Sequence, residues 1–301
     1  MKTSFVLIIM LAFSPAVFSK ELKLATFNTY WLYDDKPPHL KWWTNQRGKK
    51  GQTYEESLSL IATAIKKTGA DIIALQEIES LQVVNDLNKK LADISVEYPY
   101  VWISNSTDDI TGQNVALLSK YPKAHGTNIE DRYINERETY LTENDQGNES
   151  EAELSKALRV DLEFDGKELT VFVFHLKSQR GGSVSDQRRI AQASIVRRLT
   201  LPLIQSGKRM IVMGDMNADR GSPTLKRLRG FDDIYADLIQ PIHNQNFNGD
   251  KWTYKYDGRT QQLDHILLSP SLRETFTSGH IQSDYNRKTS DHLILVLTLN
   301  L

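Results

Sequence analysis

The apolar positions of this chain form short blocks that predict an alternation of strands and helices. Residues 21–30 alternate and are rich in strand-forming side chains, so they predict a strand that ends at Asn28. Residues 54–68 place apolar side chains at helical spacing, and Gly69 ends that pattern. Residues 70–75 are a short apolar run typical of a buried strand. The first quarter of the chain therefore predicts the order strand, helix, strand.

The rest of the chain continues this alternation and adds an antiparallel pair. Residues 159–164 and 169–174 read as strands, and the Asp165-Gly166 pair between them is a strong hairpin signal. The remaining patterns predict helices at 81–92 and 185–199 and strands at 101–104, 115–118, 210–213, 263–268 and 293–299. Mixed strands and helices with a hairpin predict one α/β domain containing antiparallel pairs rather than a pure βαβ array.

Two stretches predict no regular structure. Residues 31–53 contain Pro37-Pro38 and several bases, interleaved with Trp42 and Trp43. This mixture fits a surface that binds phosphates and stacks on rings, with Arg47 among its bases. It fits equally a solvated loop whose two Trp pack on the core. Residues 123–155 are polar and turn-rich, and 143–151 is expected to be an exposed loop.

The N-terminus predicts an exported protein. Lys2, an apolar run over 5–13 and small residues up to Ser19 are typical of a signal peptide, with cleavage after Ser19 or, alternatively, after Ala16. The other interpretation is a retained anchor or a buried helix, but the run is short for a membrane span. We therefore expect residues 1–19 to be removed, residues 20–301 to form the functional domain, and the protein to be secreted or periplasmic.

The composition limits the kinds of substrate and active site that this chain can have. Without residues 1–19 the chain has 36 basic and 38 acidic side chains, a net charge of −2, so a polyanion would have to meet a local basic patch. The chain has no Cys, which excludes disulfides, thiolate metal sites and a Cys nucleophile. The 301 residues, 40% of them apolar, suffice for one large domain or two small ones.

Candidate chemistry centres on residues 209–220, where a buried strand leads into Gly214-Asp215-Met216-Asn217. Asp215 and Asn217 are two residues apart, so in an extended segment they point the same way. A charged acceptor beside a neutral amide suits the activation and aiming of a water molecule, although an Asp-Asn turn is the simpler explanation of this tetrapeptide alone.

Polar residues also sit at the ends of most other predicted strands. They are Asn28, Glu77, Asn114, His175, Asp215 with Asn217, Asp264, and Asp291 with His292. So many polar junctions predict one polar basin at one edge of a packed pair of sheets. Its carboxylates need a cation, and oxygen ligands without Cys suit Mg²⁺, Mn²⁺ or Ca²⁺. A hard cation beside a water-activating Asp and two His fits attack on phosphorus.

These junctions resemble, in order, the endonuclease/exonuclease/phosphatase superfamily. The matching segments are TFN at 26–28, ALQE at 74–77, GQNVALLS at 112–119, HLKS at 175–178, GDMN at 214–217, LDHILLS at 263–269 and SDH at 290–292. The resemblance implies an α/β fold, a four-layer sandwich of two packed mixed β-sheets flanked by helices.

The resemblance also implies roles for single residues. The implied catalytic residues are His175, Asp215, Asn217, Asp264 and His292. Among them, Asp215 resembles the residue that activates water, Asp264 the carboxylate that orients His292, and both His the phosphate contacts. The implied metal-side residues are Glu77, Asn28 and Asp291, with Mg²⁺ the expected ion and Mn²⁺ or Ca²⁺ as alternatives.

The basic and aromatic segments favour a nuclease that acts on DNA. The expected substrate-binding residues are Asn114, Lys177, Arg180, Trp42, Lys49 and Lys50. No long hydrophobic hairpin suited to a lipid surface is evident, so we expect a monomeric phosphodiesterase without stable membrane association. The alternatives are a phosphomonoesterase or a phospholipase C-type, sphingomyelinase-like enzyme, and a non-catalytic nucleic-acid-binding module. No polar junction is replaced by an apolar residue, which argues against the non-catalytic alternative.

Overall fold

The computed structural model describes residues 19–48, 51–127, 133–142, 148–231 and 233–301. The expected signal peptide, apart from Ser19, and the expected phosphate contacts Lys49 and Lys50 lie outside the described residues. All structural statements below concern the described part of the chain.

The larger sheet has seven strands and is built around the N-terminal strand. Its spatial order is β10 (Phe247–Asn248), β14 (Phe276–Gln282), β15 (Ile294–Asn300), β1 (Glu21–Leu32), β2 (Ile72–Ile78), β4 (Asn114–Ser119) and β3 (Tyr100–Ile103). Strand β1 pairs parallel with β2 and antiparallel with β15, so the sheet is mixed. The strand predicted at the N-terminus is confirmed, and it extends beyond the predicted end at Asn28 to Leu32.

The smaller sheet has four strands in the order β13 (Asp264–Leu268), β9 (Met210–Asp215), β8 (Lys167–His175) and β7 (Ala157–Phe164). Strands β8 and β9 are parallel, with His175 opposite Asp215, while antiparallel β13 places Asp264 opposite the same Asp215. Three of the predicted site residues therefore stand in one row across the end of this sheet.

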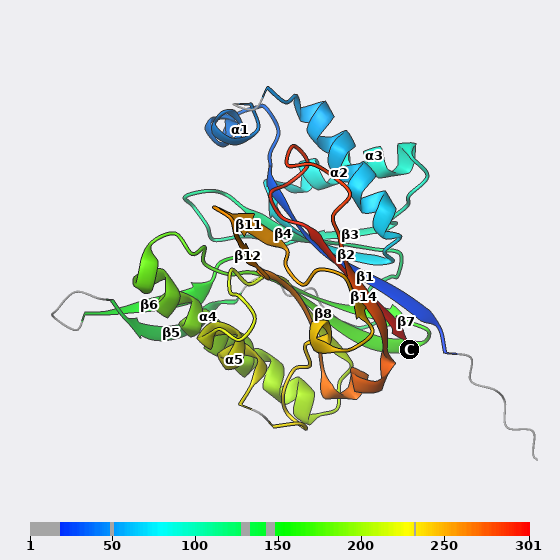
Figure 1. Ribbon diagram of the computed structural model, residues 1–301, viewed down its shortest axis with the longest axis vertical. Coiled ribbons are helices and arrows are strands. Elements are labelled where there is room, and N and C mark those ends of the chain that lie inside the picture. The colour runs from blue at the N-terminus through cyan, green and yellow to red at the C-terminus, as the bar shows by residue number, and fades with distance from the viewer. Residues whose placement is uncertain (1–18, 49–50, 128–132, 143–147, 232) are drawn as a thin grey trace, which may run out of the picture.

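The two sheets face each other, and helices cover their outer faces (Figure 1). A central core of buried Leu, Val, Ile and Phe side chains fills the space between the sheets. A second core joins the seven-stranded sheet to α2 (Tyr54–Thr68) and α3 (Leu81–Asp93). A third joins the four-stranded sheet to α4 (Gly182–Gln205) and α5 (Pro223–Arg229). This order of helix, sheet, sheet and helix confirms the expected four-layer sandwich.

Local sequence signals explain where several elements begin and end. The Thr53 side chain accepts a hydrogen bond from the Glu56 backbone N–H, and Gly69 adopts a left-handed conformation that ends α2, as predicted. Asp165 and Gly166 both have positive φ, which is the turn geometry that suits the twist of the β7–β8 hairpin. The predicted helix at 185–199 is confirmed within α4, which begins three residues earlier and ends six later.

Two expectations of irregular structure were wrong. Helix α1 (Leu40–Gln46) forms directly after the Pro37-Pro38 pair, because the prolines exclude a helix at their own positions and not beyond them. In the polar tract, β5 (Tyr133–Leu141) and β6 (Glu149–Leu154) pair into a two-stranded ribbon that projects from the body of the molecule (Figure 1). Ala152 and Leu154 of β6 are buried, but most residues of both strands are polar and carry little apolar alternation, which explains why the pattern missed them.

The remaining elements are short. A second small ribbon, β11 (Tyr254–Tyr256) with β12 (Arg259–Gln261), precedes β13, and 3₁₀ helices cover Pro241–His243 and Pro270–Thr275. Within the described residues, no helix combines the length and the apolar character needed to cross a membrane.

Candidate active site

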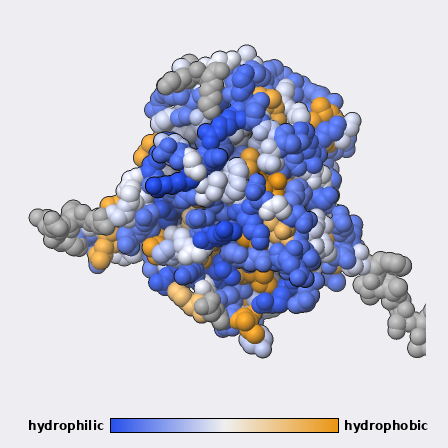
Figure 2. Space-filling view, in the orientation of Figure 1, coloured by the Kyte–Doolittle hydropathy of each residue, from blue (hydrophilic) through white to orange (hydrophobic). Residues whose placement is uncertain are grey.

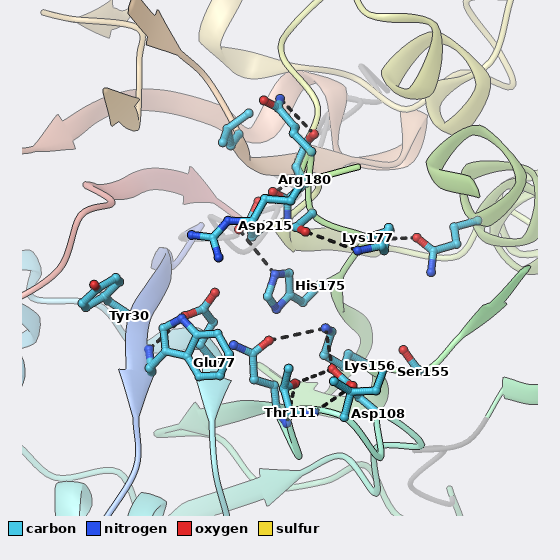
Figure 3. Close-up of a pocket in the computed structure, with 18 of the residues that line it drawn as sticks. Tyr30, Glu77, Asp108, Thr111, Ser155, Lys156, His175, Lys177, Arg180 and Asp215 are labelled. Atoms are coloured by element: carbon cyan, nitrogen blue, oxygen red, sulfur yellow. Dashed lines mark hydrogen bonds and ion pairs between the residues drawn. The ribbon is translucent and has the colours of Figure 1, made fainter. Parts of the chain in front are cut away.

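A cavity of about 610 Å³ opens where the ends of β1 and β2 from one sheet meet the ends of β8 and β9 from the other (Figure 3). Six polar residues expected at strand ends line it: Glu77, His175, Asp215, Asn217, Asp291 and His292. The fold thus brings these residues into one basin, as the sequence pattern predicted.

The backbone around this cavity is strained. Seven non-glycine residues of the described chain have positive φ, and four of them, Tyr30, Trp31, Glu77 and Asn217, line the cavity. Register shifts in β1 after Asn28 and in β2 after Gln76 mark bulges at the same place. Left-handed backbone costs about 1–2 kcal/mol at a residue with a side chain, so surrounding contacts must hold these residues in position. The bulges aim side chains into the basin that regular strands would direct elsewhere.

Asp215 lies at the centre of the site. Its Oδ2 accepts a hydrogen bond of 2.9 Å from the Asn28 amide, and its Oδ1 accepts one of 2.8 Å from the Asn217 backbone N–H. The same Oδ2 lies 3.6 Å from Nε2 of His175 and 3.9 Å from Nε2 of His292. Burial raises the pKa of Asp215, while the charge of His292 opposes that rise. A carboxylate with a raised pKa that is fixed by two donors suits a general base.

His292 and Asp264 form a buried hydrogen-bonded pair. Nδ1 of His292 lies 2.7 Å from Oδ2 of Asp264, which is completely buried. Burial acts to lower the pKa of His292, but the charges of Asp264, Asp215 and Asp291 outweigh it and hold the pKa well above its usual range. The raised pKa favours the charged imidazole, whose Nε2 lies 3.9 Å from Oδ2 of Asp215.

The pKa of His175 is shifted in the opposite direction to that of His292. Burial lowers the pKa of His175, and the positive charges of Lys156, His292 and Lys177 lower it further. Within the described residues its Nδ1 has no hydrogen-bond partner. The site thus pairs one neutral and one charged imidazole on either side of Asp215, which suits a reaction that needs both an acceptor and a donor.

The residues expected on the metal side fit a divalent cation. Burial raises the pKa of Glu77, and the charge of Asp291 adds to that rise. Asp291 makes no hydrogen bond or ion pair with any described residue, and both carboxylates line the cavity. Two adjacent carboxylates without a cationic partner, beside the Asn28 amide, are an oxygen-rich set of the kind that Mg²⁺ prefers.

A second group of possible ligands is better explained without a metal. Ligand atoms of Asp215, Asp264 and His292 lie within 4.8 Å of one another. Nδ1 of His292, however, already serves the hydrogen bond to Asp264, and a charged imidazole cannot bind a metal. The hydrogen bond to Asp264 therefore already occupies one ligand atom of this trio, and the cavity-lining carboxylates of Glu77 and Asp291 are the other oxygen atoms that could hold a cation.

Aromatic side chains line one side of the cavity. The rings of Trp31 and Trp42 stack with centroids 5.1 Å apart, and Lys41 lies over the Trp42 ring. Tyr30 lines the cavity beside them, and Tyr254 lies against the His292 ring. The structure therefore places Trp42 at the cavity, as expected. Trp31 and Tyr30 directly follow the TFN segment, which was the available signal for them.

Cationic side chains lie on another side. Lys177 and Arg180 line the cavity as expected, joined by Lys156 and Arg188, which the sequence did not single out. In Figure 3, Lys156 and Lys177 lie on the opposite side of His175 from Tyr30 and Glu77. Lys156 directly precedes the observed strand β7, but the predicted strand began only at residue 159, so the pattern did not place Lys156 at a strand end.

Asn114 and Arg47 have positions that their expected roles did not anticipate. The Asn114 side chain does not line the cavity; it accepts from Ser104 and the Ser106 backbone N–H and donates to the Glu79 and Gly112 carbonyls, so it braces the adjoining loop. Arg47, one of the bases in the segment that fitted either a phosphate-binding surface or a solvated loop, is completely buried. It donates to the backbone carbonyls of residues 29, 30, 31, 288 and 289, so it is a structural cross-link.

Asn217 lines the cavity but also joins two loops. Its side-chain amide donates to the Leu176 carbonyl at 3.1 Å, and its own backbone carbonyl accepts from the Gln179 side chain. This fixes the segment after β8 against the segment after β9, and so holds His175 and Asp215 in register.

Fold and site together give a sandwich of two packed sheets with a cavity lined by carboxylates and two histidines at one edge. The profile of the Endonuclease/Exonuclease/phosphatase family matches residues 25–292, and the chain belongs to this family, whose members are metal-dependent phosphoesterases. No curated protein matches the sequence.

Solved structures with the same fold are distant in sequence. A mutant beta toxin from Staphylococcus aureus with bound magnesium ions shares 14% identity and superposes with a TM-score of 0.62, covering 94% of this chain and 100% of the toxin. An endonuclease/exonuclease/phosphatase from Bacteroides vulgatus shares 17% identity and superposes with a TM-score of 0.62, covering 94% of this chain and 99% of its own. Truncated TDP2 from Caenorhabditis elegans shares 15% identity and superposes with a TM-score of 0.57, covering 93% of this chain and 98% of its own. At these identities the likeness shows the fold alone.

Proposed function

We propose that this protein is a divalent-metal-dependent phosphodiesterase that hydrolyses nucleic acid, with DNA as the favoured substrate. The observation that carries the proposal is the position of Asp215, fixed by Asn28 and Asn217 between a neutral and a charged imidazole beside a site suited to a cation. This arrangement matches the needs of water attack on a phosphodiester.

In the proposed mechanism, Asp215 accepts a proton from the attacking water as the water oxygen bonds to phosphorus; the P–O bond to the leaving oxygen breaks, and that oxygen takes up a proton from water. His292, charged through its pairing with Asp264, donates to a phosphoryl oxygen as negative charge builds up on it. His175 supplies a second ring nitrogen on the other side of Asp215. A cation held by Glu77, Asp291 and Asn28 would neutralise phosphate charge. Mg²⁺ is the proposed ion, supported by the magnesium bound in the beta toxin structure.

The walls of the cavity support a nucleic acid substrate. The stacked Trp31 and Trp42 rings offer a surface for bases, and Lys177 and Arg180 offer charge to phosphates. The face of the molecule in Figure 2 is mostly hydrophilic, and its hydrophobic residues form small separate groups. That surface supports a substrate met in water rather than at a lipid interface.

The test is a nicking assay on supercoiled plasmid, with separate reactions in Mg²⁺, Mn²⁺, Ca²⁺ and EDTA, and with Asp215→Asn as the inactive control. We expect nicked and linear DNA in at least one metal, no cleavage in EDTA, and no cleavage by the variant. Sphingomyelin vesicles and p-nitrophenyl phosphate are run in parallel. Cleavage of either one with intact plasmid would assign the site to a lipid phosphodiester or a phosphomonoester instead.

We also propose that the protein is exported and acts as a monomer without stable membrane association. The proposal rests on the Lys2-led apolar run and the small residues before Ser19. N-terminal sequencing of protein from the secreted or periplasmic fraction should begin at Lys20, and size-exclusion chromatography with light scattering should give one chain per particle. A first residue of Met1, or a dimer mass, would contradict the respective part.

A further inference from the structure

Arg188 is a cation in the cavity without a structural partner. It lies in the second turn of α4 and is half-buried, and it makes no hydrogen bond or ion pair with any described residue. Its Nε atom is buried and unpaired. A guanidinium seldom gives up water without a partner, because burying an unpaired charged donor is costly. A ligand anion is the partner that such a position lacks.

The neighbouring Arg189 shows the contrast. Arg189 is buried, donates to the Lys177 carbonyl at 3.1 Å and the Ser178 carbonyl at 2.9 Å, and pairs with Asp186. Its charge therefore fixes the loop after β8. Gln192 completes this support by accepting from the Lys177 backbone N–H at 2.8 Å. The backbone that carries Lys177 is thus held on both sides, and its side chain has a fixed origin.

Lys177 and Lys156 share this wall with Arg188. Nζ of Lys177 has one long contact, 3.4 Å to the Ser178 hydroxyl, and no carboxylate partner within the described chain. Burial lowers the pKa of Lys177, and the nearby charges of Arg188 and Lys156 lower it further, which shows that the three cations crowd one region. Lys156 is balanced by Asp108 at 3.1 Å.

The acids around this wall do not neutralise it. Glu153 lines the cavity, but its carboxylate pairs with Arg137 at 2.6 Å. Asp108 is the one carboxylate that pairs with any of the three cations in the described residues, and the neighbouring Asp109, which also lines the cavity, pairs with none of them, so Lys177 and Arg188 remain without a carboxylate partner on this wall. Lys156 and Lys177 also act on the pKa of His175, which places this excess next to the reacting phosphate.

We propose that Lys156, Lys177 and Arg188 form a second anion-binding subsite, beside the position of the scissile phosphate. This inference rests on the proposed function and specifies its substrate class. The preferred substrate carries a second phosphate next to the phosphodiester that is cut, as a nucleotide strand does. The aromatic residues on the other side of the cavity then receive a base, so the substrate lies across the cavity in one direction.

The test is a binding experiment that does not depend on turnover. Calorimetry in the presence of Mg²⁺ compares thymidine 3′,5′-bisphosphate with the 5′- and 3′-monophosphates. Charge-assisted hydrogen bonds to a second phosphate should make the bisphosphate bind about tenfold or more tightly than either monophosphate. Arg188→Gln and, separately, Lys177→Gln should remove most of this preference. The matched control is Arg198→Gln, which makes the same change further along α4, outside the cavity, and should keep the preference.

Equal affinity of the wild-type protein for all three nucleotides would overturn the subsite, and so would an unchanged preference in Arg188→Gln. The melting temperature of each variant shows that it is folded. The two proposals fail separately. If the protein prefers the bisphosphate but does not cleave plasmid, the subsite proposal stands and the nuclease proposal is wrong. If it cleaves plasmid without this preference, only the subsite proposal is wrong.

Discussion

The His292–Asp264 pair gives the sharpest prediction, because its loss should affect stability and turnover through different steps. Oδ2 of Asp264 has its hydrogen bond to His292, and Oδ1 has no partner among the described residues. His292→Ala would therefore leave a fully buried carboxylate uncompensated, which typically costs about 3–5 kcal/mol. In a protein of this size, each kcal/mol lowers the melting temperature by about 2–4 °C, so we expect a fall on the order of 10 °C.

The loss of turnover should exceed what this destabilisation explains. Removing a donor to the phosphoryl oxygen costs about 10²–10⁴ in rate, measured per folded molecule. Asp264→Asn should also lower turnover, because a neutral amide favours the charged imidazole less. In the double variant the rate losses should be far from multiplicative, since the pair acts as one unit. The double variant should also be more stable than His292→Ala alone, because the buried charge is gone.

The assay combines thermal unfolding with plasmid nicking corrected for the folded fraction. The control is His265→Ala. His265 is a buried histidine of β13, the strand that also carries Asp264, and its ring contacts the Ala218 carbonyl and the Gln240 side chain. That variant should lose stability and keep its turnover per folded molecule. If His292→Ala behaved like this control, the pair would be purely structural and the proposed role of His292 would be refuted.

The other predictions concern the cation, the aromatic wall and the buried arginine. Excess EDTA should abolish cleavage, and Glu77→Gln should raise the Mg²⁺ concentration needed for half-maximal activity; full activity in EDTA would exclude the cation. Trp42→Ala should weaken single-stranded DNA binding by about 1–3 kcal/mol in fluorescence anisotropy, and an unchanged Kd would contradict base stacking. Arg47→Met removes a donor from five carbonyls, of which those of Trp31 and Lys288 keep another donor, so urea unfolding should show a loss of several kcal/mol; a loss below about 1 kcal/mol would contradict the cross-link.

Patterns of burial made much of the fold predictable. The runs that form the central core alternate or are continuous in the sequence, and they mark β1, β2, β8 and β9 because burial is periodic there. Glycines with left-handed backbone, such as Gly69, marked a helix end. The β5–β6 ribbon was not predicted because its strands are polar. Helix α1 was not predicted because it is short and follows two prolines.

The candidate site was predictable where polar residues interrupt buried strands, and less so elsewhere. Asp215 and His175 interrupt apolar runs, so their position at a sheet edge follows from the sequence. Arg188 sits on a helix with charged neighbours, and nothing in the pattern distinguishes it from Arg189, which is structural. Arg47 looked like an exposed base because its five carbonyl partners come from segments far apart in the sequence. Such assignments depend on tertiary contacts that no local pattern contains.

Two hydrogen bonds of the candidate site also connect the two sheets. Asn28 of β1 donates to Asp215 of β9, and His292, just before β15, joins Asp264 of β13, so each bond crosses from one sheet to the other. Elsewhere the sheets meet through apolar contacts, which tolerate small sliding movements. Catalytic competence and sheet alignment are therefore one property of this molecule. During folding, activity can emerge only when the two sheets have docked, which makes turnover a direct readout of that final step.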